Sequence, residues 1–117
     1  MPRQEPGEPY FRISADEASE MHGNEDVVFI DVRRPDEYAE GHIKDAMFIP
    51  VDDVIQRVDE LPKDKKLLFI CAVGVRSGLA CEMAAAMGVE QERLYNIEDG
   101  TPTWVEKGYP TSFGSDP

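Results

Sequence analysis

Residues 67–77 read Leu67-Leu68-Phe69-Ile70-Cys71-Ala72-Val73-Gly74-Val75-Arg76-Ser77. The first four are apolar residues typical of buried β-strands, and the run stops on a cysteine. A loop of small residues follows, and a helical pattern opens at about Arg76 or Ser77. In a parallel α/β sheet, ligands bind beyond the carboxyl ends of the strands, where each loop turns into the next helix. The stretch therefore predicts a buried strand that ends in a functional loop.

Cys71 occupies the position in this loop where a nucleophile would be activated. It faces the N-terminus of the following helix, whose unpaired N–H groups and dipole favour negative charge. The thiolate, which is the reactive form of cysteine, is therefore favoured over the thiol. We expect the backbone N–H groups from Ala72 to Arg76 to surround the sulfur. The Arg76 side chain is expected to bind an anionic substrate or to orient the loop, and Ser77 to cap the helix.

The loop Cys71-Ala72-Val73-Gly74-Val75-Arg76-Ser77 resembles the active-site loop of the rhodanese family, whose pattern is Cys-x-x-Gly-x-Arg-Ser. Two further blocks match the family in the same order. The upstream block contains Asp31-Val32-Arg33, Glu37-Tyr38, Gly41-His42-Ile43, Ala46 and Ile49-Pro50, and the downstream block contains Gly88, Gly100 and Trp104. The match runs from about Ile13 to Gly108, and three ordered blocks are a stronger signal than one heptapeptide.

The resemblance implies one rhodanese module, with a central five-stranded, mostly parallel sheet and helices on both faces. It also implies a thiosulfate sulfurtransferase, in which sulfane sulfur moves from a donor such as thiosulfate to cyanide or a thiol through a persulfide on Cys71. The expected partners are a small anionic sulfur donor and a cyanide or thiol acceptor, with a protein thiol as a further acceptor. The implied site comprises the catalytic Cys71, the anion-binding loop of Ala72, Val73, Gly74, Val75, Arg76 and Ser77, and the supporting pair Asp31 and Arg33.

Strands and helices alternate along the chain, which by itself predicts an α/β fold with a mostly parallel sheet. Apolar residues repeat with a helical period over 51–61, and a capping box at Ser14 and Glu17 opens another helix. We expect a single domain over residues 10–110, with flexible ends at 1–9 and 111–117. The expected strands are 10–13, 27–32, 46–49, 67–70 and, as the last, 93–97; the expected helices are 14–21, 35–40, 51–61 and the one after the cysteine loop.

The composition excludes several kinds of partner. The formal net charge of −12 disfavours nucleic acid and anionic membrane surfaces, which attract basic patches. No apolar run approaches the about 20 residues that a membrane span requires, and the N-terminus lacks the apolar segment of a signal peptide. We therefore expect a cytoplasmic protein whose 2 cysteines stay reduced. No Cys/His cluster has zinc-ligand spacing, so we expect neither a metal nor a cofactor.

Five residues have both a structural and a chemical interpretation. Asp31 and Arg33 are interpreted as a structural charged pair, and His42 as a locally packed residue, because a preformed thiolate needs no general base. Cys81 is interpreted as a small buried residue. Asp99 stands where the family usually has the first of two glycines, and a carboxylate close to the cysteine loop would alter the preference for anionic substrates.

Three alternative functions remain. One is a module that carries or senses persulfide without turnover. Another is a phosphatase or arsenate reductase of related fold, although those enzymes have a loop one residue longer than the 4 residues between Cys71 and Arg76. The third is a dithiol redox protein that uses Cys71 and Cys81, which is disfavoured because the two do not form a Cys-x-x-Cys motif.

Overall fold

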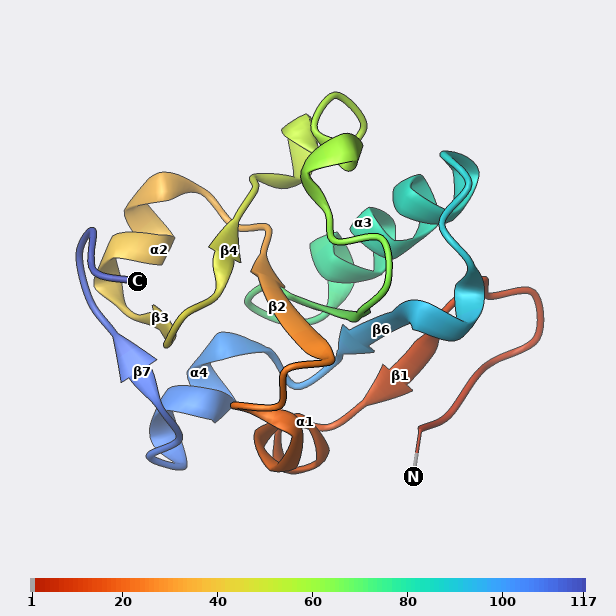
Figure 1. Ribbon diagram of the computed structural model, residues 1–117. Helices are drawn as coiled ribbons and strands as arrows, with labels where there is room; N and C mark the ends of the chain where they lie inside the picture. Colours follow the sequence, from red (N-terminus) through yellow and green to blue (C-terminus); the bar gives the residue numbers. More distant parts are fainter. Residues whose placement is uncertain (1) are drawn as a thin grey trace.

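The computed structural model describes residues 2–117 and is built around one parallel sheet (Figure 1). Five strands form this sheet, and all neighbouring pairs are parallel. A second, two-stranded antiparallel sheet lies at one side of the molecule. The strands of the large sheet, in spatial order, are β1 (Phe11–Ile13), β6 (Leu94–Ile97), β5 (Lys66–Ile70), β2 (Val27–Asp31) and β4 (Met47–Phe48), and the small sheet pairs β3 (His42–Ile43) with β7 (Thr111–Ser112). The predicted α/β fold with a five-stranded sheet is confirmed.

Helices cover both faces of the large sheet (Figure 1). The α-helices are α1 (Ala15–Met21), α2 (Pro35–Glu40), α3 (Val75–Ala86) and α4 (Gly100–Glu106), and short 3₁₀ turns are η1 (Val51–Asp53), η2 (Val58–Glu60) and η3 (Gln91–Arg93). Alternate residues of β5 enter different cores, as a strand buried on both faces requires. Phe69 and the following Cys71 pack on the α3 side, whereas Leu68 and Ile70 pack on the side of α1 and α4, with the fully buried Trp104.

The start of α1 follows the sequence prediction. The backbone N–H of Glu17 donates to Ser14 Oγ at 3.1 Å, and the backbone N–H of Ser14 donates to Glu17 Oε1 at 2.9 Å. This reciprocal pair satisfies two N–H groups that have no partner within the helix. The predicted capping box is confirmed.

The prediction of a helix over residues 51–61 is wrong, because the segment forms only the turns η1 and η2. Most of its apolar side chains still face the core, where Val54 and Leu61 are buried and Val51 and Val58 pack against them, but Ile55 is 46% exposed. The segment is rich in β-branched valine and isoleucine and in aspartate, which favour the α-helix weakly, and it lies between Pro50 and Pro62. The apolar spacing identified the buried face but not the backbone that presents it.

Both expected flexible ends make backbone contacts. Arg3 forms an antiparallel bridge with Arg12, and Thr111 and Ser112 form β7, so that residues 94–97 are not the last strand as expected. Met1 lies outside the described residues. The mobility of segments 1–9 and 111–117 stays a prediction. Within residues 2–117, no helix has the length and apolar character needed to span a bilayer.

The loops that follow the two central strands, β2 and β5, lie together at the carboxyl ends of the strands. β2 and β5 are neighbours, but the chain continues from β2 to β4 on one side of the sheet and from β5 to β6 on the other. Loops that leave adjacent parallel strands in opposite directions open a crevice at their carboxyl ends, and such crevices bind ligands. Asp31 ends β2 and Cys71 follows β5, so both lie at this edge.

Candidate functional site

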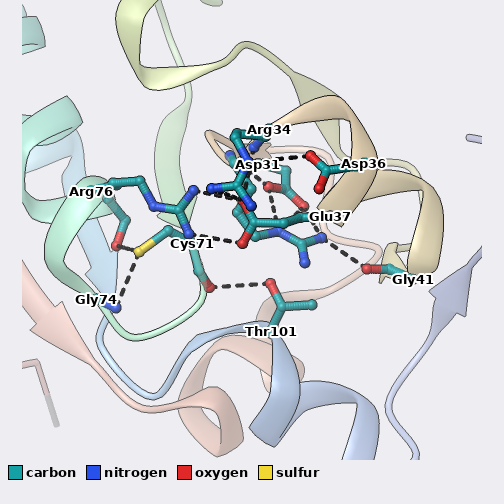
Figure 2. A network of polar contacts seen from close by, with 11 residues as sticks. Asp31, Arg34, Asp36, Glu37, Gly41, Cys71, Gly74, Arg76 and Thr101 are labelled. Carbon is teal, nitrogen blue, oxygen red and sulfur yellow. Dashed lines mark hydrogen bonds and ion pairs between the residues drawn. The ribbon is translucent and has the colours of Figure 1, made fainter.

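Cys71 lies directly after β5, and its sulfur faces the loop that leads into α3 (Figure 2). The backbone N–H of Gly74 donates a hydrogen bond to Cys71 Sγ over 3.1 Å. The Ser77 hydroxyl lies 3.3 Å from the same sulfur. Both Cys71 and Ser77 are fully buried. The loop therefore directs polar hydrogens at one shielded sulfur atom.

The environment of Cys71 favours the thiolate. Burial raises the pKa of the thiol, but hydrogen bonds from the Ser77 hydroxyl and from the backbone N–H groups of Ser77, Val73 and Gly74 outweigh it, and the pKa is lowered from its usual value. Cys81 differs, because burial without such donors raises the pKa of its thiol well above the usual value. The two cysteines thus have opposite reactivity.

Gly74 gives the loop its shape. It occupies the N-cap position of α3 with φ at +88°, a conformation that disfavours any side chain. A Cβ at this position would lie 2.8 Å from the Glu98 carbonyl oxygen. The prediction that Ser77 caps the helix is wrong: Ser77 is the third residue of α3, and its hydroxyl is turned inward to the sulfur. Glycine replaces it at the cap because only glycine fits there.

The backbone of Cys71 is hydrogen-bonded to the start of α4. The backbone N–H and the hydroxyl of Thr101 both donate to the Cys71 carbonyl oxygen, at 2.9 and 3.2 Å. Gly100 has φ at +82°, and a Cβ there would overlap the carbonyl group of Ala72. The close approach of these two backbone segments therefore requires glycine at position 100.

The Arg76 guanidinium, expected to bind an anionic substrate or to orient the loop, is already engaged in an ion pair. It donates to both carboxylate oxygens of Glu37 in α2, at 2.7 and 3.0 Å (Figure 2). The Arg76 guanidinium lowers the pKa of Glu37 to about 2. Glu37 also accepts from the backbone N–H of Arg34 at 3.1 Å, which caps α2. The ion pair ties α2 to α3 across the opening of the crevice.

Asp31 and Arg33 form a buried ion pair at the end of β2. Arg33 Nε donates to Asp31 Oδ1 at 2.9 Å, and an Arg33 terminal nitrogen donates to Oδ2 at 2.6 Å. The same guanidinium donates to the Gly41 carbonyl oxygen at 2.8 Å. Asp31 is fully buried and Arg33 is 6% exposed. The pair braces the chain that carries α2, and within residues 2–117 neither side chain hydrogen-bonds to the Cys71 sulfur.

Three other residues have positions that decide their interpretation. His42 is buried, stacks on Tyr38 and hydrogen-bonds to two backbone carbonyl oxygens, so it packs locally as expected. Cys81 is fully buried in α3, as expected for a small core residue. The Asp99 carboxylate accepts from the backbone N–H of Ala15 at 2.8 Å and caps α1. The aspartate at this position therefore has a structural role at the start of α1.

Sequence reasoning missed two residues that shape the site. Glu37 was noted only as part of a matching block, although it binds Arg76. Asn96 was noted only within a strand, although its side chain contacts both Ser77 and Gly74. A polar residue inside the otherwise apolar run of β6 was the available signal, because buried polar side chains need partners.

The comparisons with known proteins agree with this geometry. The family model described as "Rhodanese-like domain" matches residues 14–107. A sulfurtransferase of Allochromatium vinosum is 36% identical over 86 residues, which cover 74% of this chain and 78% of that protein. The putative sulfurtransferase YtwF of Bacillus subtilis is 34% identical over 90 residues, covering 77% and 84%. The crystal structure of a rhodanese-like domain protein from Staphylococcus aureus superposes with a TM-score of 0.76 at 30% identity, covering 89% of this chain and 98% of that one.

The match covers the cysteine loop, the four α-helices and every strand of the large sheet except β1. Relatives of this identity and coverage carry the name sulfurtransferase, which supports sulfur transfer as the broad activity. A family match over most of the chain and a shared fold lead to one assignment: the chain belongs to the family of rhodanese-like domains.

Proposed function

We propose that this protein transfers sulfane sulfur through a persulfide on Cys71. The thiolate attacks the outer sulfur of a donor such as thiosulfate. A bond forms between Cys71 Sγ and that sulfur, while the bond to the sulfite group breaks and sulfite leaves with the electron pair. Cyanide or a thiolate then attacks the terminal sulfur, takes it as thiocyanate or a persulfide, and releases the Cys71 thiolate. Each step is a displacement at sulfur and needs no external oxidant or reductant.

The observation that carries the proposal is the set of donors on one buried sulfur. The Gly74 N–H donates to Cys71 Sγ over 3.1 Å, and the Ser77 hydroxyl, 3.3 Å from the sulfur, can turn its hydrogen to the thiolate. Donors placed in this way stabilise an anion on sulfur, both in the resting thiolate and in the thiolate that leaves when the acceptor attacks. A hollow of about 410 Å³ lies between α2 and α4, and Ala72 of the cysteine loop and Thr101 line it.

Mass spectrometry of the intact protein after thiosulfate treatment tests this function. We expect a mass gain of one sulfur atom, on the peptide that contains Cys71, because that thiolate is the activated one. A thiol reductant should reverse the gain. Cys81→Ser protein serves as the control and should gain the same sulfur. A protein that stays unmodified by thiosulfate and by other sulfane donors, or that carries the sulfur on Cys81, would contradict the proposal.

The ion pair of Arg76 and Glu37 is expected to restrain the reaction with a dianion such as thiosulfate. Glu37→Gln removes the negative charge that is paired with the Arg76 guanidinium. The positive charge of Arg76 then becomes available to attract the anionic sulfur donor. One charge interaction across about 4 Å in water is about 1 kcal/mol, which corresponds to about a five-fold rise in the rate of persulfide formation with thiosulfate. Stopped-flow or quenched kinetics at low donor concentration measure this rate.

Glu40→Gln is the matched control for that experiment. Glu40 lies on the same helix, lines the same hollow and is exposed, so its replacement changes the net charge equally. We expect Glu40→Gln to change the rate much less, because the carboxylate does not hold Arg76. Equal acceleration by both variants would mean that only the overall charge matters, and slower persulfide formation in Glu37→Gln would mean that the ion pair orients the loop.

A further inference from the structure

The Ser77 hydroxyl lies between two groups that both accept hydrogen bonds. Its oxygen is 2.5 Å from Asn96 Oδ1 and 3.3 Å from Cys71 Sγ. All three side chains are buried, with Asn96 the most exposed at 3%. A hydroxyl carries a single hydrogen, so Ser77 can donate to only one of these neighbours at a time.

Gly74 determines which atom of Asn96 faces Ser77. The Asn96 amide nitrogen donates to the Gly74 carbonyl oxygen at 3.0 Å, and this bond turns the amide oxygen toward the hydroxyl. An amide oxygen can only accept. Two oxygens 2.5 Å apart need a hydrogen between them, and only the Ser77 hydroxyl can provide it. The lone pairs of the Ser77 oxygen then face Cys71, where they can accept a hydrogen bond from the S–H group of a neutral thiol.

The thiolate requires the opposite arrangement. When the thiol proton leaves to solvent, the sulfur can only accept, so the hydroxyl hydrogen has to turn from Asn96 toward Cys71. The thiolate therefore gains this hydrogen bond only when Asn96 Oδ1 loses its donor. We propose that Asn96 is a positioning residue that competes with the Cys71 sulfur for the single hydroxyl hydrogen of Ser77, and thereby limits the fraction of thiolate. The inference goes beyond the proposed function and uses from it only that Cys71 is the nucleophile.

The other groups around the sulfur are the same in every variant that tests this competition. The charged ones are Arg76 on α3 with its partner Glu37 on α2, and the buried pair of Asp31 and Arg33 at the end of β2. Their contributions cancel when variants at position 96 are compared with the wild type. A difference in the titration of Cys71 then reports on Asn96.

The test is a pH titration of Cys71, followed by the ultraviolet absorbance of the thiolate with Cys71→Ser as the blank, and checked by the rate of alkylation with iodoacetamide. Asn96→Ala leaves the Ser77 hydroxyl free to donate to sulfur, so the midpoint should fall by about one pH unit. Asn96→Asp keeps an acceptor at the same place and makes it stronger, so the midpoint should rise by about one pH unit or more. Asn96→Val fills the strand position if the alanine variant does not fold.

The fall in Asn96→Ala separates competition from a merely structural role, because the new charge of Asn96→Asp raises the midpoint in either case. Both variants lose the bond to the Gly74 carbonyl, so an asparagine that only held the loop would leave the sulfur with weaker donors and raise the midpoint in Asn96→Ala as well. Shifts of the same sign would overturn the proposal. In a Ser77→Ala background, Asn96→Ala should leave the midpoint unchanged, and a persisting downward shift would equally overturn it. Cys81→Ala, on the same helix, is the packing control and should titrate like the wild type. No sulfur donor is used, so the result is independent of the sulfurtransferase activity.

Discussion

Replacing Cys71 by serine is expected to reduce sulfur transfer from thiosulfate to cyanide by at least about 10³-fold, to the background rate. A serine hydroxyl remains protonated near neutral pH, and it cannot form a persulfide. The fold should persist, because the smaller oxygen can accept from the Gly74 N–H and bond to Ser77 as the sulfur does. Formation of thiocyanate, measured against thermal unfolding of the same sample, separates lost chemistry from lost structure.

Cys81→Ser is the matched control, because it makes the same chemical change ten residues later in the chain. The Cys81 thiol is fully buried and bonds to the Tyr95 carbonyl oxygen, which a serine hydroxyl can also reach. We expect this variant to keep most of its activity. Equal losses in the two variants would support a dithiol mechanism. Hydrolysis of an aryl phosphate by the wild type that disappears in Cys71→Ser would instead support a phosphatase.

The largest loss of stability is expected from Asp31→Asn. This change removes the negative partner of Arg33, whose side chain is only 6% exposed and so gains little hydration in exchange. Breaking a buried ion pair on one side typically costs about 3–5 kcal/mol, a large part of the stability of a domain of this size. Denaturant unfolding followed by tryptophan fluorescence measures the change, since Trp104 is fully buried in the core that also contains Phe29 of β2.

Asp36→Asn is the control for the ion pair. Asp36 pairs with Arg34 at 3.3 Å, but both side chains are about 70% exposed, so water replaces the lost interaction. We expect its unfolding midpoint to match that of the wild type closely. If Asp31→Asn unfolds at the same denaturant concentration as Asp36→Asn, the buried pair does not brace this edge of the sheet. By the same reasoning, Arg33→Ala leaves the buried Asp31 carboxylate without its partner. We expect this variant to lower the stability of the fold rather than the chemistry at Cys71.

Much of the fold could be predicted because it depends on local patterns. The apolar runs at 27–32 and 67–70 specified the two central strands, and the capping box at Ser14 specified the start of α1. The segment 51–61 shows the limit of this reasoning. Its apolar spacing is compatible with a helix, yet β-branched side chains and flanking prolines leave two 3₁₀ turns that bury the same face.

The sequence by itself determined the family and predicted Cys71 as the nucleophile, because a cysteine at the end of an apolar strand, followed by small residues and a helix, is a pattern confined to a few consecutive residues. Only the tertiary structure decided what surrounds that nucleophile. Arg76 meets Glu37, which is 39 positions away, Cys71 is held by Thr101, 30 positions away, and Ser77 meets Asn96, 19 positions away. Contacts at such separations form when strands and helices pack, and no local periodicity records which side chains will face each other. These contacts decide whether the Arg76 charge is available to a substrate and whether the Ser77 hydroxyl hydrogen is available to the sulfur.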